Sequence, residues 1–276
     1  MKIKKLLGIA GLAVVASAVL VACGSKTSSS DGKEEVNFAT VGTTKPFSYE
    51  KDGKLTGYDV EVAKAVFKDS DKYKVNFEKI EWSSLFTGID AGKYQMGGNN
   101  ISFSKERASK YLFSTPIGST PSVLVVPKDS DITSYDDISG HSTQVVQGTS
   151  TATQLENYNK EHSSNPVDIN YTEENINQML ANVNSGKFDF KIFDAPSVNT
   201  IIKDQGLDNV KTIDLPSDEK PFIYFIFGSD QEDLQDFVNK RLKELEKDGT
   251  LAKLSEEYLG GNYAPSADEM KIPSAD

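Results

Sequence analysis

Arg107 stands where it could hold a carboxylate. It follows Ser104 by three residues in the stretch "NNISFSKERASKYLFSTP", and because serine is a preferred N-cap, Arg107 is expected in the first turn of a short helix. A cation is unfavourable at that end of the helix dipole. The position makes sense if a carboxylate shares the site, because free amide groups and the guanidinium would both donate to it. The alternative is a solvated arginine among Lys105, Glu106 and Lys110.

Asp194 is the acidic counterpart of this arginine. It follows the stretch "KFDFKIF" and precedes Ala195 and Pro196, which suit the first turn of a helix. In open α/β sheets, ligands gather outside the carboxyl ends of the strands, where this acid is expected to lie. Aspartate is also among the best helix N-caps, so capping is the alternative role, and one carboxylate can do both.

The loop "QGTST", from Gln147 to Thr151, is a third polar element. A phosphate-binding loop needs a lysine after its last glycine, which is missing here, so nucleotide binding is disfavoured. The remaining interpretations are an amide-rich nest for a carboxylate, with Thr149 in it, and an ordinary glycine turn. Trp82, the only tryptophan, either packs in the core or forms the aromatic wall of a pocket.

Alternating strands and helices are expected to position these residues. The first half of the chain has the order strand, helix, strand, helix, strand, starting near Val36. It includes a hairpin that turns at Asp52-Gly53 and a helix capped by Asp59. The pattern restarts after the stretch "PSVLVVPKDSD". Short connections between such elements are typical of an α/β fold.

Two similarly built lobes follow from this repeated pattern. The segments "GKYQMGGNN" and "GKFDFKIFD" resemble each other and occupy equivalent places in the two halves. The strands "SVLVVP" and "FIYFIFG" are expected to cross between the lobes, because each follows a complete α/β set, so the first lobe is discontinuous. The predicted bounds are residues 36–125 and 226–262 for the first lobe, 126–225 for the second lobe, and 263–276 for a loose C-terminal tail.

The N-terminus has the pattern of a bacterial lipoprotein. Lysines and the apolar run "LLGIAGLAVVASAVLVA" precede Cys23, which indicates a cleaved signal peptide over residues 1–22 rather than a short membrane span. The tetrapeptide from Leu20 to Cys23 resembles the lipobox, so Cys23 is expected to carry lipid and to anchor the chain at the extracytoplasmic face of the cell membrane. Residues 23–35 are rich in serine and charge and predict a flexible tether.

Composition argues against several other classes of protein. Cys23 is the only cysteine, so disulfides and cysteine-based metal sites are excluded. His141 and His162 lie too far apart in sequence to suggest a zinc site or a serine-histidine triad, and we expect neither metal nor cofactor. The net charge is −11, and without residues 1–22 the chain has 27 basic against 41 acidic residues, a net charge of −14. This acidity argues against a nucleic-acid partner.

The motifs resemble a known family, the extracellular solute-binding proteins of the polar amino-acid uptake class, which are the receptors of ABC importers. The resemblance covers nearly the whole mature chain and is strongest in "GKLTGYDVEVAKAV", "SFSKERASKYLFSTP" and "KRLKELEKDGTLAKLSEEYLG". It implies a type II periplasmic-binding-protein fold, with a ligand cleft between two lobes joined by hinge strands, a membrane permease as partner, and a monomer. In such proteins the residue matching Arg107 holds the α-carboxylate of the ligand, and the residue matching Asp194 holds its α-ammonium group.

The same resemblance implies further ligand contacts. Trp82 matches the aromatic wall of the site, and Ser102 matches a hydroxyl beside the carboxylate. Thr149 matches a donor from the second lobe, and Asn100 matches a position whose main-chain oxygen faces the ammonium group.

Some positions depart from the family pattern and affect the part of the site that would hold the ligand side chain. Thr44 lies where relatives often have an aromatic residue, for which Phe47 or Tyr49 is expected to compensate. Lys191 and Phe193 lie where relatives usually have small apolar residues.

The sequence favours a neutral polar amino acid as ligand. Asn99, Asn100 and Gln147 are polar, and the expected ligand loops "GTTKPF", "GGNNISF" and "VVQGTST" have no surplus acid that would favour arginine, lysine or histidine. The stretch around Arg107 is most similar to relatives that take cystine. Two alternatives remain open: an enzyme on the same scaffold, similar to cyclohexadienyl dehydratases, and a surface adhesin or sensor.

Overall fold

The computed structural model describes residues 32–217 and 220–274. The predicted signal peptide, Cys23 and most of the predicted tether lie outside the described residues. Strand β1 (Glu34–Thr40) begins before the predicted start of the globular part at residue 36. Within the described ranges, no helix is both long and apolar enough to cross a membrane.

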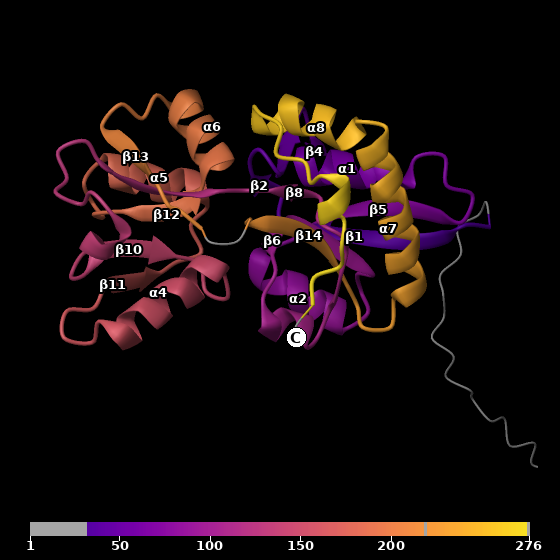
Figure 1. The fold of residues 1–276 in the computed structure, drawn as a ribbon, viewed down its shortest axis with the longest axis horizontal. Helices are drawn as coiled ribbons and strands as arrows, with labels where there is room; N and C mark the ends of the chain where they lie inside the picture. Colours follow the sequence, from indigo (N-terminus) through magenta and orange to yellow (C-terminus); the bar gives the residue numbers. More distant parts are fainter. Residues whose placement is uncertain (1–31, 218–219, 275–276) are drawn as a thin grey trace, which may run out of the picture.

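The first lobe is a mixed sheet covered by helices on both faces (Figure 1). Besides β1, its main elements are α1 (Tyr58–Phe67), β5 (Tyr73–Lys79), α2 (Trp82–Asp90), β6 (Met96–Ser102), α3 (Lys105–Ala108), β7 (Leu112–Phe113), β8 (Gly118–Ser119), β14 (Phe222–Phe227), α7 (Glu232–Lys247) and α8 (Thr250–Leu259). The strand order is β5-β1-β6-β14-β7, and β8 also pairs with β14. β1 runs parallel to β5 and β6, whereas β14 runs antiparallel to β6.

The second lobe repeats this arrangement. Its elements are β9 (Ser122–Pro127), η1 (Tyr135–Ile138), β10 (Ser142–Val145), α4 (Ser150–Glu161), β11 (Asp168–Tyr171), α5 (Ile176–Asn184), β12 (Lys191–Asp194), α6 (Ala195–Gln205) and β13 (Val210–Asp214). β10 pairs with β11, β9 lies between β12 and β13, and a bridge between Thr143 and Phe190 joins the two sets. The resulting order, β11-β10-β12-β9-β13, has one antiparallel strand, β9, next to the strand at the edge, as β14 is in the first lobe. The predicted two-lobed α/β fold is therefore confirmed.

The chain crosses between the lobes before β9 and before β14, and not within these strands as predicted. Among the described strands, β9 pairs with β12 and β13 of the second lobe, so the first lobe ends before Ser122 and not at residue 125. β14 pairs with β6, β7 and β8, so the first lobe resumes at Phe222 and not at residue 226. Each strand has both edges occupied inside one sheet, which leaves the connecting segments as the hinge. Thr120 N donates to Pro221 O at 2.8 Å, so these segments are hydrogen-bonded to each other.

The apolar runs of β9 and β14 are explained by burial on both faces. Along β14, Ile223, Phe225 and Phe227 belong to the core under α1, α7 and α8, whereas Tyr224 and Ile226 belong to the core under α2. Alternate side chains of β9 divide in the same way between the two cores of the second lobe. A strand buried on both faces has no polar side, so its sequence is a continuous hydrophobic run.

The predicted hairpin is confirmed, but the predicted helix cap beside it is wrong. The hairpin elements are β2 (Thr43–Thr44), β3 (Ser48–Lys51) and β4 (Lys54–Thr56). Asp52 and Gly53 form its two-residue turn with φ of 52° and 72°. Helix α1 has Gly57 at its N-cap, and Asp59 does not cap it. Asp59 is instead fully buried and accepts a hydrogen bond from Asn100 N at 2.6 Å, because packing against β6 outweighs its local capping preference.

Close packing of β6 requires glycine. A Cβ atom at Gly98 would lie 2.7 Å from a ring carbon of Phe225 and 2.8 Å from one of Phe38, both buried. The two asparagines that follow Gly98 lie in the same strand. The glycine therefore allows the strand to place Asn99 and Asn100 at the edge of the first lobe.

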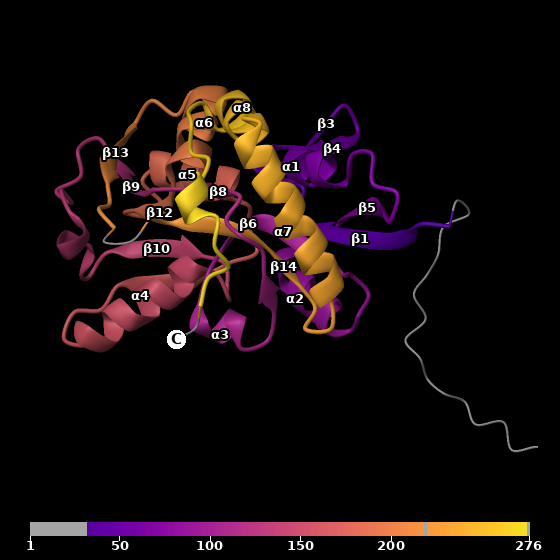
Figure 2. The ribbon, with the colours of Figure 1, turned by 45° about the vertical axis from the view of Figure 1, so that its right-hand side comes forward.

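The segment predicted as a loose C-terminal tail is packed on the first lobe. Tyr263 O accepts a hydrogen bond from Ser119 N at 2.9 Å, and Met270 is 4% exposed within the α1, α7 and α8 core. A short helix, η2 (Ala267–Glu269), lies between them, and Glu269 pairs with Lys220. Figure 2 shows this yellow segment running back across the molecule. The apolar anchor Met270 is one residue in a polar stretch, so the sequence gives little signal for it.

Candidate functional site

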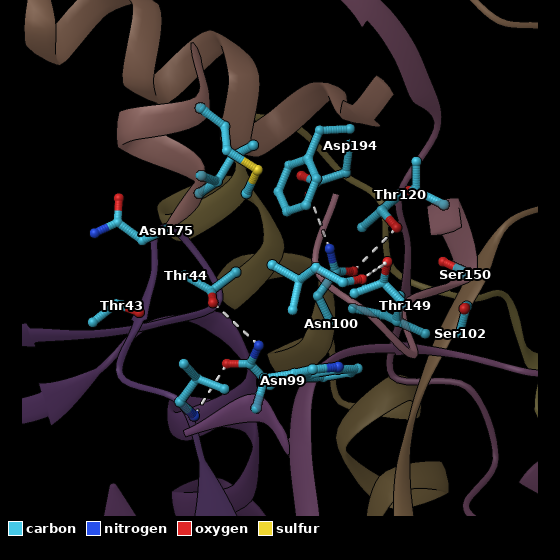
Figure 3. A pocket seen from close by; sticks show the side chains of 18 of the residues that line it. Thr43, Thr44, Asn99, Asn100, Ser102, Thr120, Thr149, Ser150, Asn175 and Asp194 are labelled. Atoms are coloured by element: carbon cyan, nitrogen blue, oxygen red, sulfur yellow. Dashed lines mark hydrogen bonds between the residues drawn. The ribbon is translucent and has the colours of Figure 1, made fainter. Parts of the chain in front are cut away.

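A cavity of about 220 Å³ lies between the lobes. Both lobes line it, with β6, the start of α2 and Arg107 from the first and the starts of α4, α5 and α6 from the second. Figure 3 shows Asn99, Asn100 and Ser102 of the first lobe together with Thr149 and Asp194 of the second. Seven of the nine predicted ligand residues line the cavity: Thr44, Trp82, Asn100, Ser102, Arg107, Thr149 and Asp194.

Arg107 lies in the first turn of α3, as expected. The Ser104 side chain accepts a hydrogen bond from Arg107 N at 3.2 Å and so caps this short helix. The guanidinium Nη1 donates to Ser102 O at 2.9 Å and to Ser102 Oγ at 3.4 Å, and Nη2 donates across the cleft to Gly148 O at 3.1 Å. These bonds hold the charged group at the cavity wall.

Two aromatic rings support the same guanidinium. Its carbon lies 5.8 Å from the ring centroid of Trp82 and 5.3 Å from that of Phe86. The two rings pack edge to face, with centroids 5.3 Å apart. Cation–π contact and burial favour one orientation of the side chain, and burial also lowers the pKa of Arg107. Trp82 therefore acts both as a wall of the cavity and as a support for the arginine.

Asp194 reaches the same cavity from the second lobe. Its Oδ1 accepts from Ser197 N at 2.8 Å, so Asp194 is the N-cap of α6. This is the alternative role that the sequence predicted for it. Its Oδ2 accepts from Asn100 Nδ2 at 2.9 Å, a bond between the lobes that Figure 3 shows. Asn100 Oδ1 in turn accepts from Thr120 Oγ1 at 3.3 Å, and Asn100 has a left-handed φ of 55°. Left-handed backbone is uncommon for residues other than glycine, and it clusters at functional sites.

Burial raises the pKa of two carboxyl groups near this end of the cavity, Asp194 in its wall and Asp59 behind Asn100. Burial raises the pKa of Asp194 to about 7. Burial, and to a lesser extent the charge of Asp194, raises the pKa of Asp59 to about 7, and the Oδ1 atom of Asp59 has no hydrogen-bond partner. A cation that entered the cavity beside Asp194 would lower its pKa again, because an opposite charge favours the ionised form.

Several helices begin at the cavity. Thr149 is the N-cap of α4, and its Oγ1 accepts from Ala152 N at 3.2 Å. Ser150, Thr151 and Asn175 line the cavity at the starts of α4 and α5. Helix N-termini present unpaired amide groups and positive partial charge, which suit an anion.

Two predicted ligand residues do not line the cavity. Phe47 is fully buried in the core of the first lobe, because its ring is needed to fill the space beside α1. Gln147 is exposed and lies just before the α4 cap, where the turn directs the chain from the strand to the helix. Tyr49, the other proposed substitute for an aromatic at Thr44, lies at a separate surface hollow with Lys45. The ring that relatives use at position 44 is therefore not replaced by either residue.

The structure adds residues that the sequence did not indicate. Glu81, Glu173 and Glu174 line the cavity, although no surplus acid was expected. Lys191 and Phe193, noticed only as departures from the family pattern, also line it. Nothing local distinguishes these residues, because they meet only where the start of α2 in the first lobe faces α5 and β12 in the second. Within residues 32–217 and 220–274, no group of three or more His, Cys, Asp or Glu side chains could hold a metal ion.

Comparison with known sequences decides the family. The pattern of the bacterial extracellular solute-binding proteins, family 3, matches residues 36–261, which is most of the chain. The chain belongs to this family. Its members are extracellular solute-binding proteins, and the lobes and cleft described above agree with their type II fold.

Individual relatives of this family 3 protein support the assignment. The probable amino-acid-binding protein YxeM of Bacillus subtilis is 37% identical, over 88% of this chain and 90% of YxeM. The L-cystine-binding protein TcyA of Bacillus subtilis is 34% identical, over 90% of this chain and 94% of TcyA.

A solved structure is more similar still. It comes from work on the molecular and structural basis of glutathione import in Gram-positive bacteria via GshT and the cystine ABC importer TcyBC of Streptococcus mutans. It is 62% identical with a TM-score of 0.84, covering 86% of this chain and 99% of its own. The curated and structural relatives are binding proteins of transporters.

Proposed function

We propose that this family 3 protein is the substrate-binding lipoprotein of an ABC importer, and that it captures an amino acid between its lobes. The observation that carries the proposal is the presence of Arg107 from the first lobe and Asp194 from the second in one cavity. In the proposed complex Arg107 holds the α-carboxylate and Asp194 the α-ammonium group. The type II fold supports closure of the lobes around such a ligand by hinge motion.

The proposed chemistry matches the charge of an amino-acid head group. A free amino acid has one positive and one negative group on the same carbon, so each lobe can bind one of them. Charge-assisted hydrogen bonds contribute about 1.5 to 3 kcal/mol each. A few of them together with side-chain burial reach about −8 kcal/mol, which corresponds to micromolar affinity. The ligand therefore stabilises the closed form by bridging the lobes.

We propose cystine as the ligand, with glutathione as the second candidate. TcyA is an L-cystine-binding protein, which supports cystine. The structure that is 62% identical comes from work on glutathione import and a cystine importer, which supports either compound. The two compounds share an α-amino-acid head, a sulfur atom and a second carboxylate, so both fit the proposed grip of Arg107 and Asp194.

Native mass spectrometry and calorimetry test the proposal. Protein purified without denaturation is expected to release a ligand with an α-amino-acid head, and its mass distinguishes cystine from glutathione. Arg107→Ala is expected to weaken binding of that ligand at least 100-fold, since a loss of about 2.7 kcal/mol is within the range for an unpaired buried charge. Lys110→Ala, which changes an exposed lysine near the same helix, is the control and should bind normally. Failure of L-amino acids, cystine and glutathione to bind or to raise the melting temperature would refute the proposal.

We also propose a lipid anchor at Cys23 and delivery to a membrane permease by a monomer. The lipobox-like tetrapeptide ending at Cys23 supports the anchor. Metabolic labelling with a fatty-acid analogue should modify the wild-type protein, whereas Cys23→Ala should release an unlabelled chain into the medium. A permease and an ATPase encoded beside this gene would support uptake over a role as an adhesin or sensor.

We propose that the cleft catalyses no reaction. A dehydratase needs an acid or base placed for proton transfer, and the Asp194 carboxylate is engaged as a helix cap and by Asn100. Product formation from prephenate or arogenate by the purified protein would contradict this view.

A further inference from the structure

Lys191 is a buried lysine at the wall of the cavity. It lies in β12 and is 3% exposed, and it lines the same cavity as Arg107 and Asp194. Its ammonium donates to Gln144 O at 2.9 Å. In the part of the chain that the structure describes, no carboxylate forms an ion pair with it. An ammonium has three donors, so a single main-chain acceptor leaves it undersupplied.

The surroundings make this placement costly unless a ligand compensates for it. The neighbouring cavity wall is apolar, with Ile176, Met179 and Phe193, and the Phe193 ring centroid lies 5.8 Å from Nζ. Burial lowers the pKa of Lys191 to about 7, and no acid offsets this effect. A buried ammonium is tolerated when it is paired. An acidic group of the ligand satisfies this requirement. A methionine at this position would fill the same space without the cost of burying an unpaired charge.

One acid of the cavity wall, Glu174, is already held by other groups. Glu174 Oε2 accepts from Gln144 Nε2 at 2.9 Å and from Asn182 Nδ2 at 2.9 Å. Asn182 Nδ2 also donates to Gln144 Oε1 at 2.7 Å. Gln144 thus connects both charges, with its side chain on Glu174 and its carbonyl on Lys191. This buried network fixes the lysine and leaves its remaining donors for another acceptor.

Lys191 is separated from the groups that would hold the amino-acid head. It precedes Asp194 by three residues in β12, so their Cα atoms are about 10 Å apart at the usual rise of an extended strand. In the proposed complex the α-carboxylate is already held by Arg107 and the α-ammonium group by Asp194, so a carboxylate for Lys191 has to be a second one.

We propose that Lys191 is a specificity-determining residue that binds a second carboxylate of the ligand, remote from its α-amino-acid head. This inference rests on the proposed function of the cleft. The glycine carboxylate of glutathione and the second α-carboxylate of cystine are both such groups. A single neutral amino acid lacks the group and leaves the lysine unpaired, so the site selects an elongated ligand with two carboxylates.

Calorimetry with matched ligands tests this role. Wild-type protein is titrated with glutathione and with its glycinamide analogue, and with cystine and with cystine that has one carboxyl converted to an amide. For the true ligand, the acid is expected to bind 10-fold to 100-fold more tightly than the amide. Lys191→Met is expected to bind the two equally. Lys187→Met, a change of an exposed lysine in the same lobe, should keep the wild-type ratio.

Stability without ligand separates this role from a structural one. If Lys191 served only to hold Gln144, Lys191→Met would melt at a lower temperature, whereas removal of an unpaired buried charge should leave the melting temperature equal or higher. An acid-to-amide ratio that is unchanged in Lys191→Met overturns the inference while leaving the proposed function intact. No binding of either ligand pair to the wild-type chain overturns both.

Discussion

Replacement of Asp194 by asparagine is expected to weaken ligand binding without destabilising the fold. Asparagine is also a strong N-cap, so Asp194→Asn keeps an acceptor for Ser197 N and should keep α6. The variant loses the ionised partner of the ligand ammonium and presents an amide N–H₂ group to Asn100 Nδ2 or to the ligand. Binding and folding therefore depend on this carboxylate in opposite directions.

The magnitudes follow from burial. The pKa of Asp194 is raised from 3.8 to about 7, so ionising it in the ligand-free fold costs about 4 kcal/mol at pH 8, at about 1.36 kcal/mol per unit. The variant avoids this cost but loses a hydrogen bond worth about 1 kcal/mol, so we expect a gain of roughly 1 to 3 kcal/mol in the free energy of unfolding. In binding, the lost charge-assisted contact and the unpaired ammonium cost about 3 kcal/mol, which is about 150-fold in the dissociation constant.

Urea unfolding at pH 8 and titration calorimetry measure the two effects on the same protein. Asp208→Asn, a change of an exposed acid that does not line the cavity, is the matched control for both measurements. If Asp194→Asn binds the ligand as tightly as wild type, the ammonium does not pair with this carboxylate. If the ligand-free variant is less stable than wild type, the buried carboxylate stabilises the fold and our account of its pKa is wrong.

Three further outcomes are expected. Because Asp59 and Asp194 retain protons to about pH 7, their contribution to the stability of the ligand-free protein should fall as pH rises from about 4 to 7. Over the same pH range, ligand affinity should rise with pH because binding releases protons. Heats of binding at pH 6 that do not depend on the buffer would contradict this. Gly98→Ala should reduce the free energy of unfolding by at least 2 kcal/mol, because its Cβ would meet buried rings at 2.7 Å and 2.8 Å; normal urea stability would refute the packing argument. Truncation after Asn262 should lower the free energy of unfolding by about 2 to 3 kcal/mol, because Met270 is lost from the core. An unchanged melting temperature would show that the C-terminal segment is dispensable.

The residues whose positions could be predicted from the sequence are those fixed by their immediate neighbours in the chain. Ser104 is an N-cap three residues before Arg107, so Arg107 could be assigned to the first turn of a helix from the sequence. Asp194 could be assigned to a strand-to-helix junction because Pro196 follows it. In an α/β fold such junctions lie at the same edge of the sheet, which is why both residues line one cavity.

The errors arise where distant packing decides the outcome. Asp59 looks like a helix cap, but it accepts a bond from Asn100, which is 41 residues away. Phe47 stands close in sequence to Thr44, yet its ring fills the core of the first lobe. Lys191 could be recognised as unusual, but its surroundings depend on three separate segments, which supply Gln144, Glu174 and Asn182. The pattern of a single sequence contains no information on such contacts between distant segments.

The placement of β14 has a consequence for the order in which the chain matures. The second lobe is formed by one continuous stretch, from Ser122 to Asp214, and can assemble as soon as that stretch is available. The first lobe lacks the inner strand β14 and the helices α7 and α8 until the chain beyond Phe222 has emerged. Until then one edge of β6 has no neighbour and the core around Phe38 lacks the side chains of β14, α7 and α8, which favours aggregation. A chain that is made N-terminus first therefore completes its earliest-made half last.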